Sequence, residues 1–372
     1  MITRSALLRR SFEKTVPQLA ALAAHALPRF VYTSAGDRPD VLPVFVYHVV
    51  DASFEADLRY LQRGGYRTAG AEELAAYGRD ELEPDGRTVA LTFDDGDESL
   101  TRVAVPLLER YGFCAVAFVV TEMVPETTGR ELAGWAELRA AVSRGALEVG
   151  SHSCYHHHVP VSARVVGFVD SGTDIRFTAN IPVPRIRGDE VPTLGTPIFR
   201  GRPRYTAPAA FQPDADRIER CRLFVRERGE EVLRRSSGVG DLRRLAPRSG
   251  SRETPQAADA AVVADVSASL DRVGTRCPNA AARHLCFPWY ARNRRAEILA
   301  ERAGATLLLG GYHPTRRGGP APLLQRLSRD LMRRLPGPDR ESLLNVLRRR
   351  GQAVGAGHGW PGNGPAATSP RA

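Results

Sequence analysis

Cysteine is scarce in this chain and follows no bonding pattern. The 372 residues include five cysteines, none of which belongs to a CxxC pair. They are Cys114, Cys154, Cys221, Cys277 and Cys286. An odd number of cysteines without paired spacing argues against a disulfide framework and against a structural zinc ribbon. These cysteines favour a reducing compartment, so we expect a cytoplasmic location.

Lysine is nearly absent, and aromatic residues are few. All but one of the 52 basic residues are arginines, Lys14 being the exception, and aromatic residues make up 7% of the chain. The formal net charge of +10 and the isoelectric point of about 9.8 favour contact with anionic surfaces, but charge does not determine the fold. We expect an ordinary solvated basic surface. No nucleic-acid partner is expected, because no recognised binding motif or interleaved aromatic residues accompany the charge.

The chain also lacks a long apolar run. No run approaches the roughly 18 to 20 apolar residues that a membrane-spanning helix needs. Four basic residues precede a mildly apolar stretch at 16–27, which a proline and polar residues interrupt and which has no convincing export-type cleavage site. We therefore predict no signal peptide. The stretch is expected to pack against the body of the protein, with peripheral membrane contact through the basic N-terminus as the alternative.

The sequence does contain enough apolar residues for a core, and short apolar runs alternate with helical patterns. Hydrophobic residues make up 42% of the chain. Strands are predicted at 42–47, 88–93, 114–120, 146–150, 282–287 and 306–309. Helices are predicted at 54–65, 71–77, 99–111, 135–144, 257–273 and 294–303. Strands and helices that alternate with short connections imply parallel strands and an α/β fold.

The character of the chain changes between residues 159 and 256. Pro, Gly and Arg dominate there, and only 216–236 has a clear helical pattern. We predict a long Pro/Gly/Arg-rich insertion with little core of its own. The predicted parts are an N-terminal helical or surface segment at 1–40, a first part of the fold at 41–158, the basic insertion or lid at 159–256, a second part of the fold at 257–350 and a disordered tail at 351–372.

Two adjacent carboxylates follow the second predicted strand. Asp94, Asp95 and Gly96 stand where a parallel strand delivers its carboxyl end, which is the usual place of active sites in such sheets. Adjacent residues at a strand end point in different directions. One carboxylate can therefore bind a cation while the other works on a proton. A plain turn is the alternative, because Asp-Asp-Gly is common turn chemistry.

A pair of histidines follows another predicted strand. His152 and His156 lie four residues apart, a spacing that lets two imidazoles reach one ion. Two histidines with a carboxylate from a different strand are a usual zinc set that leaves positions open for water and substrate. The alternative is a solvated histidine run, because His157 and His158 follow directly.

These two motifs together resemble the first two motifs of the polysaccharide deacetylase family, also called the NodB-homology family. The motifs are Thr92-Phe93-Asp94-Asp95-Gly96 and His152-Ser153-x-x-His156, and the resemblance extends to Tyr47-His48 and to Leu285-Cys286-Phe287-Pro288-Trp289. It covers about residues 42 to 160 and 257 to 312. The fold that the resemblance implies is a distorted (β/α) barrel of the polysaccharide deacetylase type, here with the long Pro/Gly/Arg-rich insertion. The 41–158 and 257–350 segments would be the two parts of that barrel.

The resemblance also implies a metal site and a base. By position, Asp94 would be the general base, and Asp95, His152 and His156 would be ligands of zinc or a similar divalent ion. The expected activity is a metal-dependent hydrolysis that removes N-acetyl or O-acetyl groups from a carbohydrate, with Asp94 activating the water that the metal holds. The enzyme would be a carbohydrate deacetylase that acts on carbon–nitrogen bonds other than peptide bonds.

Further site residues follow from the third motif. The backbone N–H of Trp289 would stabilise the oxyanion, and Pro288 would fix the turn that presents it. Trp289 and Tyr290 are candidates for a sugar-binding wall, with core packing as an equal alternative. His48, after the first strand, is a candidate for lining the pocket.

The chain departs from the family pattern at two places. Cys286 occupies the position at which the family often has an arginine that tunes the base, so Arg283, Arg292 or an arginine of the insertion replaces it, or the base is untuned. The family's last motif supplies a histidine as general acid, for which His313 is the candidate and a solvated loop histidine the alternative.

The expected partner is an N-acetylated glycan or glycolipid. The arginines of the insertion suggest an anionic or phosphate-linked glycan, with a solvated lid as the alternative. Two other functions stay open: hydrolysis of a small or cyclic amide on the same scaffold, and a catalytically degenerate glycan-binding protein.

Overall fold

The computed structural model describes residues 19–33, 39–129, 131–173 and 193–355, with backbone alone at 351–355. These residues form two compact units. The barrel unit consists of the described parts of Arg4–Cys154, Val266–Tyr290 and Gly304–Ala372, and the insertion unit of those of Tyr155–Asp265 and Ala291–Ala303. The domain boundaries that composition suggests, at residues 40, 158, 256 and 350, stay a prediction. Most of the expected disordered tail, 356–372, lies outside the described residues.

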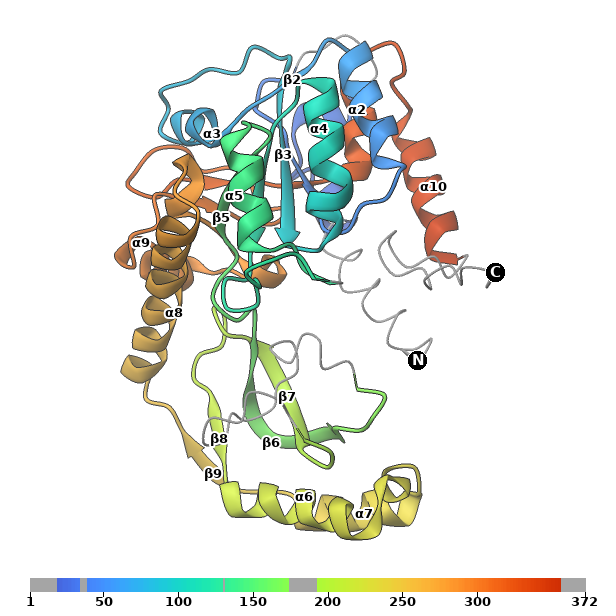
Figure 1. The fold of residues 1–372 in the computed structure, drawn as a ribbon, viewed down its shortest axis with the longest axis vertical. Coiled ribbons are helices and arrows are strands. Elements are labelled where there is room, and N and C mark those ends of the chain that lie inside the picture. Colours follow the sequence, from blue (N-terminus) through green and yellow to red (C-terminus); the bar gives the residue numbers. More distant parts are fainter. Residues whose placement is uncertain (1–18, 34–38, 130, 174–192, 356–372) are drawn as a thin grey trace. The chain divides into compact units, whose positions relative to one another are not determined.

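The barrel unit is built on one parallel sheet, which has nine strands in the described part of the chain (Figure 1). In sheet order the strands are β12 (Leu323–Leu324), β11 (Leu307–Leu309), β10 (His284–Cys286), β5 (Leu147–Ser151), β4 (Ala115–Val119), β3 (Thr88–Asp95), β1 (Val44–Tyr47) and β13 (Leu327–Ser328), with β2 (Arg67–Thr68) beside β3. Every residue of β1 and β4 is buried. Strands buried on both faces are the pattern of a parallel sheet covered by helices, and they explain why the sequence shows unbroken apolar runs.

The two end strands of this order follow each other in the chain. Only Gln325 and Arg326 separate β12 from β13. β12 pairs with β11 at one end of the order, whereas β13 pairs with β1 at the other. The chain therefore joins the two ends of the sheet within two residues, and the sheet closes into a barrel. We call Gln325–Arg326 the barrel seam. The predicted parallel α/β barrel is confirmed.

Helices follow the strands, as the sequence pattern predicts. They are α2 (Phe54–Arg63), α3 (Ala71–Gly78), α4 (Val105–Tyr111), α5 (Trp135–Ser143) and α8 (Pro255–Arg276), and a π-helical turn η2 (Leu100–Ala104) precedes α4. α2 and α4 pack side by side (Figure 1). Gly112 ends α4 in the left-handed conformation, with φ of 67°, which a residue without a Cβ adopts at no steric cost.

The chain after β11 forms elements that the sequence analysis did not predict. They are β12, β13, a 3-10 helix η7 (Arg329–Arg334) and α10 (Leu343–Gly355). Two-residue strands are too short to show any hydrophobic period, so pattern alone does not reveal them.

The insertion unit has more regular structure than its composition suggests. Its elements are β6 (His158–Phe168), β7 (Pro197–Pro203), β8 (Phe211–Pro213), α6 (Ala215–Arg228), η4 (Glu230–Leu233), α7 (Ser236–Leu245), β9 (Gly250–Arg252) and α9 (Arg294–Arg302). β6 pairs antiparallel with β7, and β8 with β9. A small core cluster joins α6 and α7 through Cys221, Val225 and Leu242.

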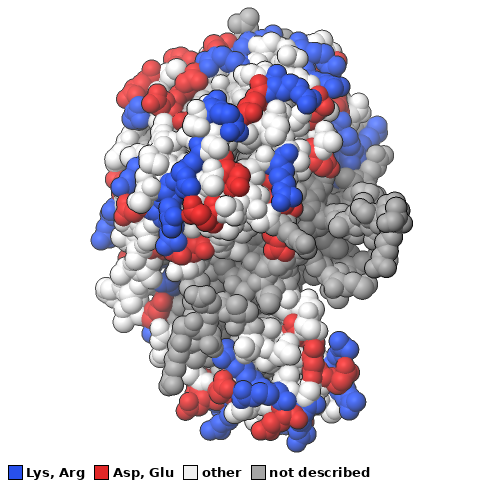
Figure 2. Space-filling view, in the orientation of Figure 1, with Lys and Arg blue, Asp and Glu red and all other residues white. Residues whose placement is uncertain are grey.

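Charge of both signs covers the face of the molecule in Figure 2, where basic and acidic side chains are interspersed. Many arginines have a carboxylate close by, as Arg139 has Glu126 at 2.8 Å and Arg272 has Glu122 at 2.6 Å. The basic side chains therefore do not form one continuous basic patch on this face. Among the described residues, no helix has the length and apolar character that spanning a bilayer demands.

Candidate active site

The two adjacent carboxylates stand at the carboxyl end of β3. Asp94 is 2% exposed, and its neighbour Asp95 is partly exposed. Asp95 and Gly96 both adopt positive φ, of 70° and 78°. The left-handed turn ends the strand at once and sends the two carboxylates in different directions, and aspartate tolerates this backbone region better than most residues. Because the two side chains point in different directions, Asp95 can bind a cation while Asp94 acts as a base.

An arginine from the barrel seam holds Asp94. Nη1 of Arg326 lies 2.6 Å from Oδ1 of Asp94, and Nη2 lies 2.8 Å from Oδ2. Nε of Arg326 donates to the carbonyl of Gly310 at 3.1 Å, so the guanidinium is fixed at three atoms. Both side chains are buried, with 0% and 2% exposure. Burial raises the pKa of Asp94, but the charge of Arg326 opposes this effect, and the pKa is held well below its usual range.

Arg326 supplies the arginine beside the base that the family often has at the position of Cys286. Arg326 is none of the arginines expected from the sequence, which were Arg283, Arg292 or an arginine of the insertion. Arg283 pairs with Asp271 at 2.9 Å, and Arg292 bonds Glu297. The only sequence signal for Arg326 is a charged residue inside an apolar run, Leu323-Leu324-Gln325-Arg326-Leu327. A buried charge is costly unless it is paired, so such a residue points to a partner.

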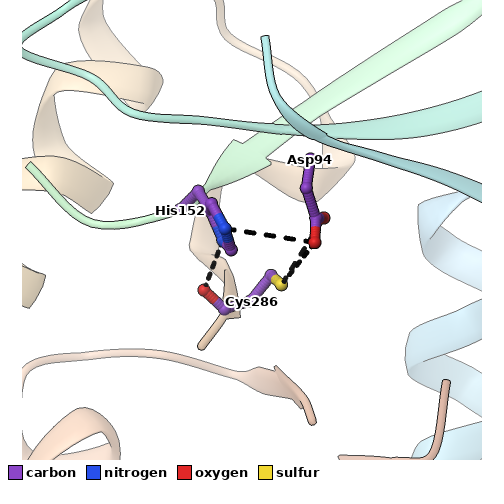
Figure 3. A group of neighbouring side chains, drawn as sticks. All are labelled: Asp94, His152 and Cys286. Atoms are coloured by element: carbon purple, nitrogen blue, oxygen red, sulfur yellow. Dashed lines mark hydrogen bonds and ion pairs between the residues drawn. The ribbon is translucent and has the colours of Figure 1, made fainter. Parts of the chain in front are cut away.

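Cys286 also contacts the base (Figure 3). Its Sγ lies 3.6 Å and 3.8 Å from the two carboxylate oxygens of Asp94. Burial raises the pKa of this thiol well above its usual value, so Cys286 is a protonated donor to the carboxylate. Asp94, His152 and Cys286 lie close enough to share a cation. A metal binds thiolate rather than thiol, and Arg326 already neutralises Asp94, so we do not assign a cation to this group.

His152 has the surroundings of a metal ligand. It stands just after β5, and its Nδ1 lies 2.9 Å from the carbonyl oxygen of Cys286 (Figure 3). An Nδ1–H that donates to this carbonyl leaves the lone pair on Nε2, which lies 3.6 Å from Oδ1 of Asp95. Metal-ligating histidines are oriented in this way by a backbone carbonyl. The pair of Asp95 and His152 therefore fits a divalent cation.

The third predicted ligand, His156, belongs to the insertion unit. It is 7% exposed and has a positive φ of 51°. Its part in the ligand set stays a prediction from the four-residue spacing.

His48 stands beside the base. In the parallel register Val44 pairs with Ala90 and Val46 with Thr92, and two residues further His48 adjoins Asp94. Its Nε2 lies 3.9 Å from Oδ2 of Asp94, and the side chain is 15% exposed. The sheet register therefore fixes this histidine at the base.

The turn after β10 presents the third-motif residues. Trp289 and Tyr290 have positive φ, of 61° and 54°, directly after the buried Pro288. The guanidinium of Arg326 lies over the ring of Tyr290, 5.1 Å from its centroid. The roles of Pro288, Trp289 and Tyr290 toward substrate stay predictions. His313 is exposed, and its role as general acid also stays a prediction.

Sequence comparison finds one family over the segment that carries the carboxylates. Residues 81–171 match the family model described as polysaccharide deacetylase. YxkH of Bacillus subtilis (strain 168), a polysaccharide deacetylase by its assigned name, is 26% identical over 129 residues. That match spans 32% of this chain and 45% of YxkH, so it covers less than half of the relative's length.

Solved structures share the fold. A de-N-acetylase from Aggregatibacter actinomycetemcomitans has a TM-score of 0.50 at 15% identity, over 83% of this chain and 99% of that one. The BpsB deacetylase domain from Bordetella bronchiseptica has a TM-score of 0.50 at 17% identity, over 80% and 98%. At such identities the likeness establishes the fold alone. The motifs at Asp94 and His152 lie inside residues 81–171, the segment that matches the polysaccharide deacetylase family model.

Proposed function

We propose that this protein is a metal-dependent hydrolase that removes N-acetyl groups, or O-acetyl groups, from a carbohydrate. The observation that carries the proposal is that the two carboxylates at the end of β3 have different partners. Oδ1 of Asp95 lies 3.6 Å from Nε2 of His152, and Oδ2 of Asp94 lies 4.0 Å from the same atom. Only Asp94 is bound at both of its oxygens by Arg326. One carboxylate is thus available to a cation and the other to a proton.

The ligand set of the proposed cation is Asp95, His152 and His156, and zinc is the expected ion. A divalent cation in such a set supplies Lewis-acid polarisation of a carbonyl and lowers the pKa of water. Groups of the protein chain carry out the proton transfer and stabilise the oxyanion. Asp94 accepts the proton of the attacking water, and the backbone N–H of Trp289 donates to the oxyanion.

Arg326 keeps the base ready for that step. Its two N–H groups fix both oxygens of Asp94, so the carboxylate does not rotate away into its buried surroundings. A base without a neighbouring arginine would favour a catalytically degenerate glycan-binding protein. The contact between Arg326 and Asp94 supports an active enzyme instead.

The substrate is proposed from the family, as an N-acetylated glycan or glycolipid. Hydrolysis of a small or cyclic amide is the competing proposal on the same scaffold. Binding of a glycan without hydrolysis is the third outcome that an experiment must separate.

Acetate release from N-acetylglucosamine oligomers tests the proposal. We expect release by protein loaded with zinc, cobalt or manganese, and a fall of roughly 10² to 10⁴ in turnover for Asp94→Asn. Tight oligomer binding without release, in all three metal forms, would favour the degenerate protein. Hydrolysis of small cyclic amides without release from the oligomers would favour the competing amide hydrolase.

A further inference from the structure

The barrel seam contains a second buried side chain besides Arg326. Gln325 is 8% exposed, and its Nε2 donates to the carbonyl oxygen of Tyr312 at 2.7 Å and to that of Ala26 at 2.8 Å. Both partners can only accept hydrogen bonds, so the amide must turn its NH2 group toward them, and it uses both of its N–H donors. A buried polar group whose donors are satisfied in this way is held in one orientation. The seam is therefore fixed at Gln325 as well as at Arg326.

The carbonyl of Tyr312 belongs to the turn after β11, residues 310–312, which we call the β11 turn. The seam donates to all three carbonyl oxygens of this turn. Nε of Arg326 donates to Gly310 and the backbone N–H of Arg326 to Gly311, each at 3.1 Å. The amide of Gln325 completes the set at Tyr312. Because one of these bonds comes from the guanidinium, a shift of the β11 turn also shifts the group that binds the base.

Two aromatic rings join the β11 turn to the same guanidinium. The ring of Tyr312 lies beside that of Tyr290, with the two centroids 5.8 Å apart. The guanidinium of Arg326 in turn lies 5.1 Å from the centroid of Tyr290. The β11 turn therefore supports Arg326 in two ways, through the carbonyl of Gly310 and through Tyr290. Loss of the bond between Gln325 and Tyr312 would loosen both supports together.

The second donor of Gln325 reaches the N-terminal part of the chain. Residues 19–33 pack on the core of the barrel unit through the buried side chains of Ala21, Leu22, Leu27, Phe30 and Val31. Nη2 of Arg340 donates to two carbonyl oxygens of this segment, that of Phe30 at 2.9 Å and that of Thr33 at 2.7 Å. The side-chain hydrogen bonds of Arg340 thus go to the segment, whereas those of Gln325 join the segment to the β11 turn.

We propose that Gln325 is a positioning residue of the active site, which holds the β11 turn so that Arg326 keeps both oxygens of Asp94. This inference rests on the proposed deacetylase function. Gln325 acts through Arg326 and takes no part in the reaction itself, because backbone carbonyls occupy both of its donors. The same amide makes the orientation of the base depend on residues 19–33.

Two substitutions at Gln325 are compared with one at Arg340. Gln325→Met has a similar length but no donor, and Gln325→Asn keeps the amide on a side chain that is one methylene shorter and cannot reach both carbonyls. Arg340→Met removes two hydrogen bonds from the same N-terminal segment, so it controls for a loss of stability alone. Acetate release from N-acetylglucosamine oligomers gives kcat and KM, and elemental analysis gives zinc per chain. The thermal midpoint of each variant is measured, and all assays run well below the lowest midpoint.

We expect Gln325→Met to lower kcat about tenfold or more while KM stays within about threefold, since a small displacement of a catalytic group slows the reaction without removing contacts to the substrate. Zinc should stay bound, because the proposed ligands are unchanged. Gln325→Asn should fall between wild-type protein and Gln325→Met. Arg340→Met should melt at a lower temperature but keep its kcat within about twofold of wild type. Unchanged kcat in both Gln325 variants, or a matching fall of kcat in Arg340→Met, would overturn the proposal.

A double substitution shows whether Gln325 acts through Arg326. In Arg326→Lys the fork that binds both oxygens of Asp94 is already lost, so adding Gln325→Met should lower kcat by no more than about twofold further. A further fall as large as in the wild-type background would show that the amide acts elsewhere, and would contradict the proposal. Wild-type protein that releases no acetate from N-acetylated glycans would contradict the proposed function, and this inference with it. Equal release by wild-type protein and Gln325→Met would contradict this inference alone.

Discussion

Asp94 is the residue on which most of the site's chemistry converges. Arg326 bonds both of its oxygens, the thiol of Cys286 donates to it, and His48 adjoins it. A carboxylate this buried would otherwise take up a proton, because burial disfavours its charged form. The arginine therefore matters as much for the state of the base as for its position.

Removal of the seam arginine should destabilise the protein. Arg326→Met leaves Asp94 buried without its counter-charge, which costs about 3 to 5 kcal/mol of unfolding free energy. Arg326→Lys should lose less, because it keeps the charge but not the bidentate fork. Urea unfolding of each variant measures the effect.

A surface pair supplies the matched control. Arg63 and Asp339 form an ion pair with 57% and 43% exposure. Arg63→Met should change the unfolding free energy by less than about 1 kcal/mol. Equal stabilities of Arg326→Met and Arg63→Met would contradict the account of the seam pair.

At the scale of elements, the site is assembled from strand ends and turns. Asp94 and Asp95 end β3, His152 follows β5, and Arg326 stands between β12 and β13. The carboxyl ends of parallel strands meet at one end of a barrel, so residues far apart in sequence converge there.

The turn after β11 is packed tightly against the turn after β10. A Cβ added at Gly311 would lie 2.7 Å from Cβ of Tyr290, whose ring supports Arg326. Gly311→Ala should therefore lower the unfolding free energy by about 1 to 3 kcal/mol, since Tyr290 must shift. Gly274→Ala in α8 is the control, because an added Cβ there meets open space, and it should stabilise by roughly 0.5 to 1 kcal/mol. Guanidinium unfolding that shows no loss for Gly311→Ala would refute the close packing of the two turns.

The strand ends could be predicted from the sequence, but the seam could not. β4 is recognisable as a strand because all its residues are apolar, and β3 because it is rich in β-forming residues up to Phe93. Arg326 is separated from Asp94 by 232 positions and lies between strands of two residues each. No local period links such residues, since only closure of the barrel brings them together. The insertion was underestimated because Pro, Gly and Arg obscure the alternation of β6 and β7.

At the scale of the whole molecule, stability should depend on pH through a buried histidine. His284 on β10 is 2% exposed, and its Nδ1 has no hydrogen-bond partner among the described residues. Burial, with a smaller effect of the charge of Arg79, lowers its pKa from 6.5 to about 4. Between these two values the unfolded chain binds a proton that the folded chain does not, so this contribution to stability is complete above pH 6.5 and is lost as the pH falls toward 4.

The slope that His284 adds should reach about 1.4 kcal/mol per pH unit between pH 6.5 and pH 4. Urea unfolding at a series of pH values measures it in the wild-type protein and in His284→Leu. We expect a flatter pH dependence in the variant, whatever its absolute stability. Parallel curves for the two proteins would show that His284 is not buried in its neutral form.

At the scale of the whole molecule, sequence similarity and fold similarity cover different lengths of the chain. The family match covers 81–171, whereas the shared fold covers about four fifths of the chain. The role of the insertion as a lid and the location of the protein stay predictions.

The most direct test of the site is its metal content. Zinc per chain is measured by elemental analysis for wild-type protein, His152→Ala and Asp94→Asn, purified side by side. Because Asp95 and His152 are assigned to the cation and Asp94 to the proton, we predict about one zinc in wild-type protein and in Asp94→Asn, and its loss in His152→Ala. Full zinc occupancy in His152→Ala, or loss of zinc in Asp94→Asn, would contradict this division of roles.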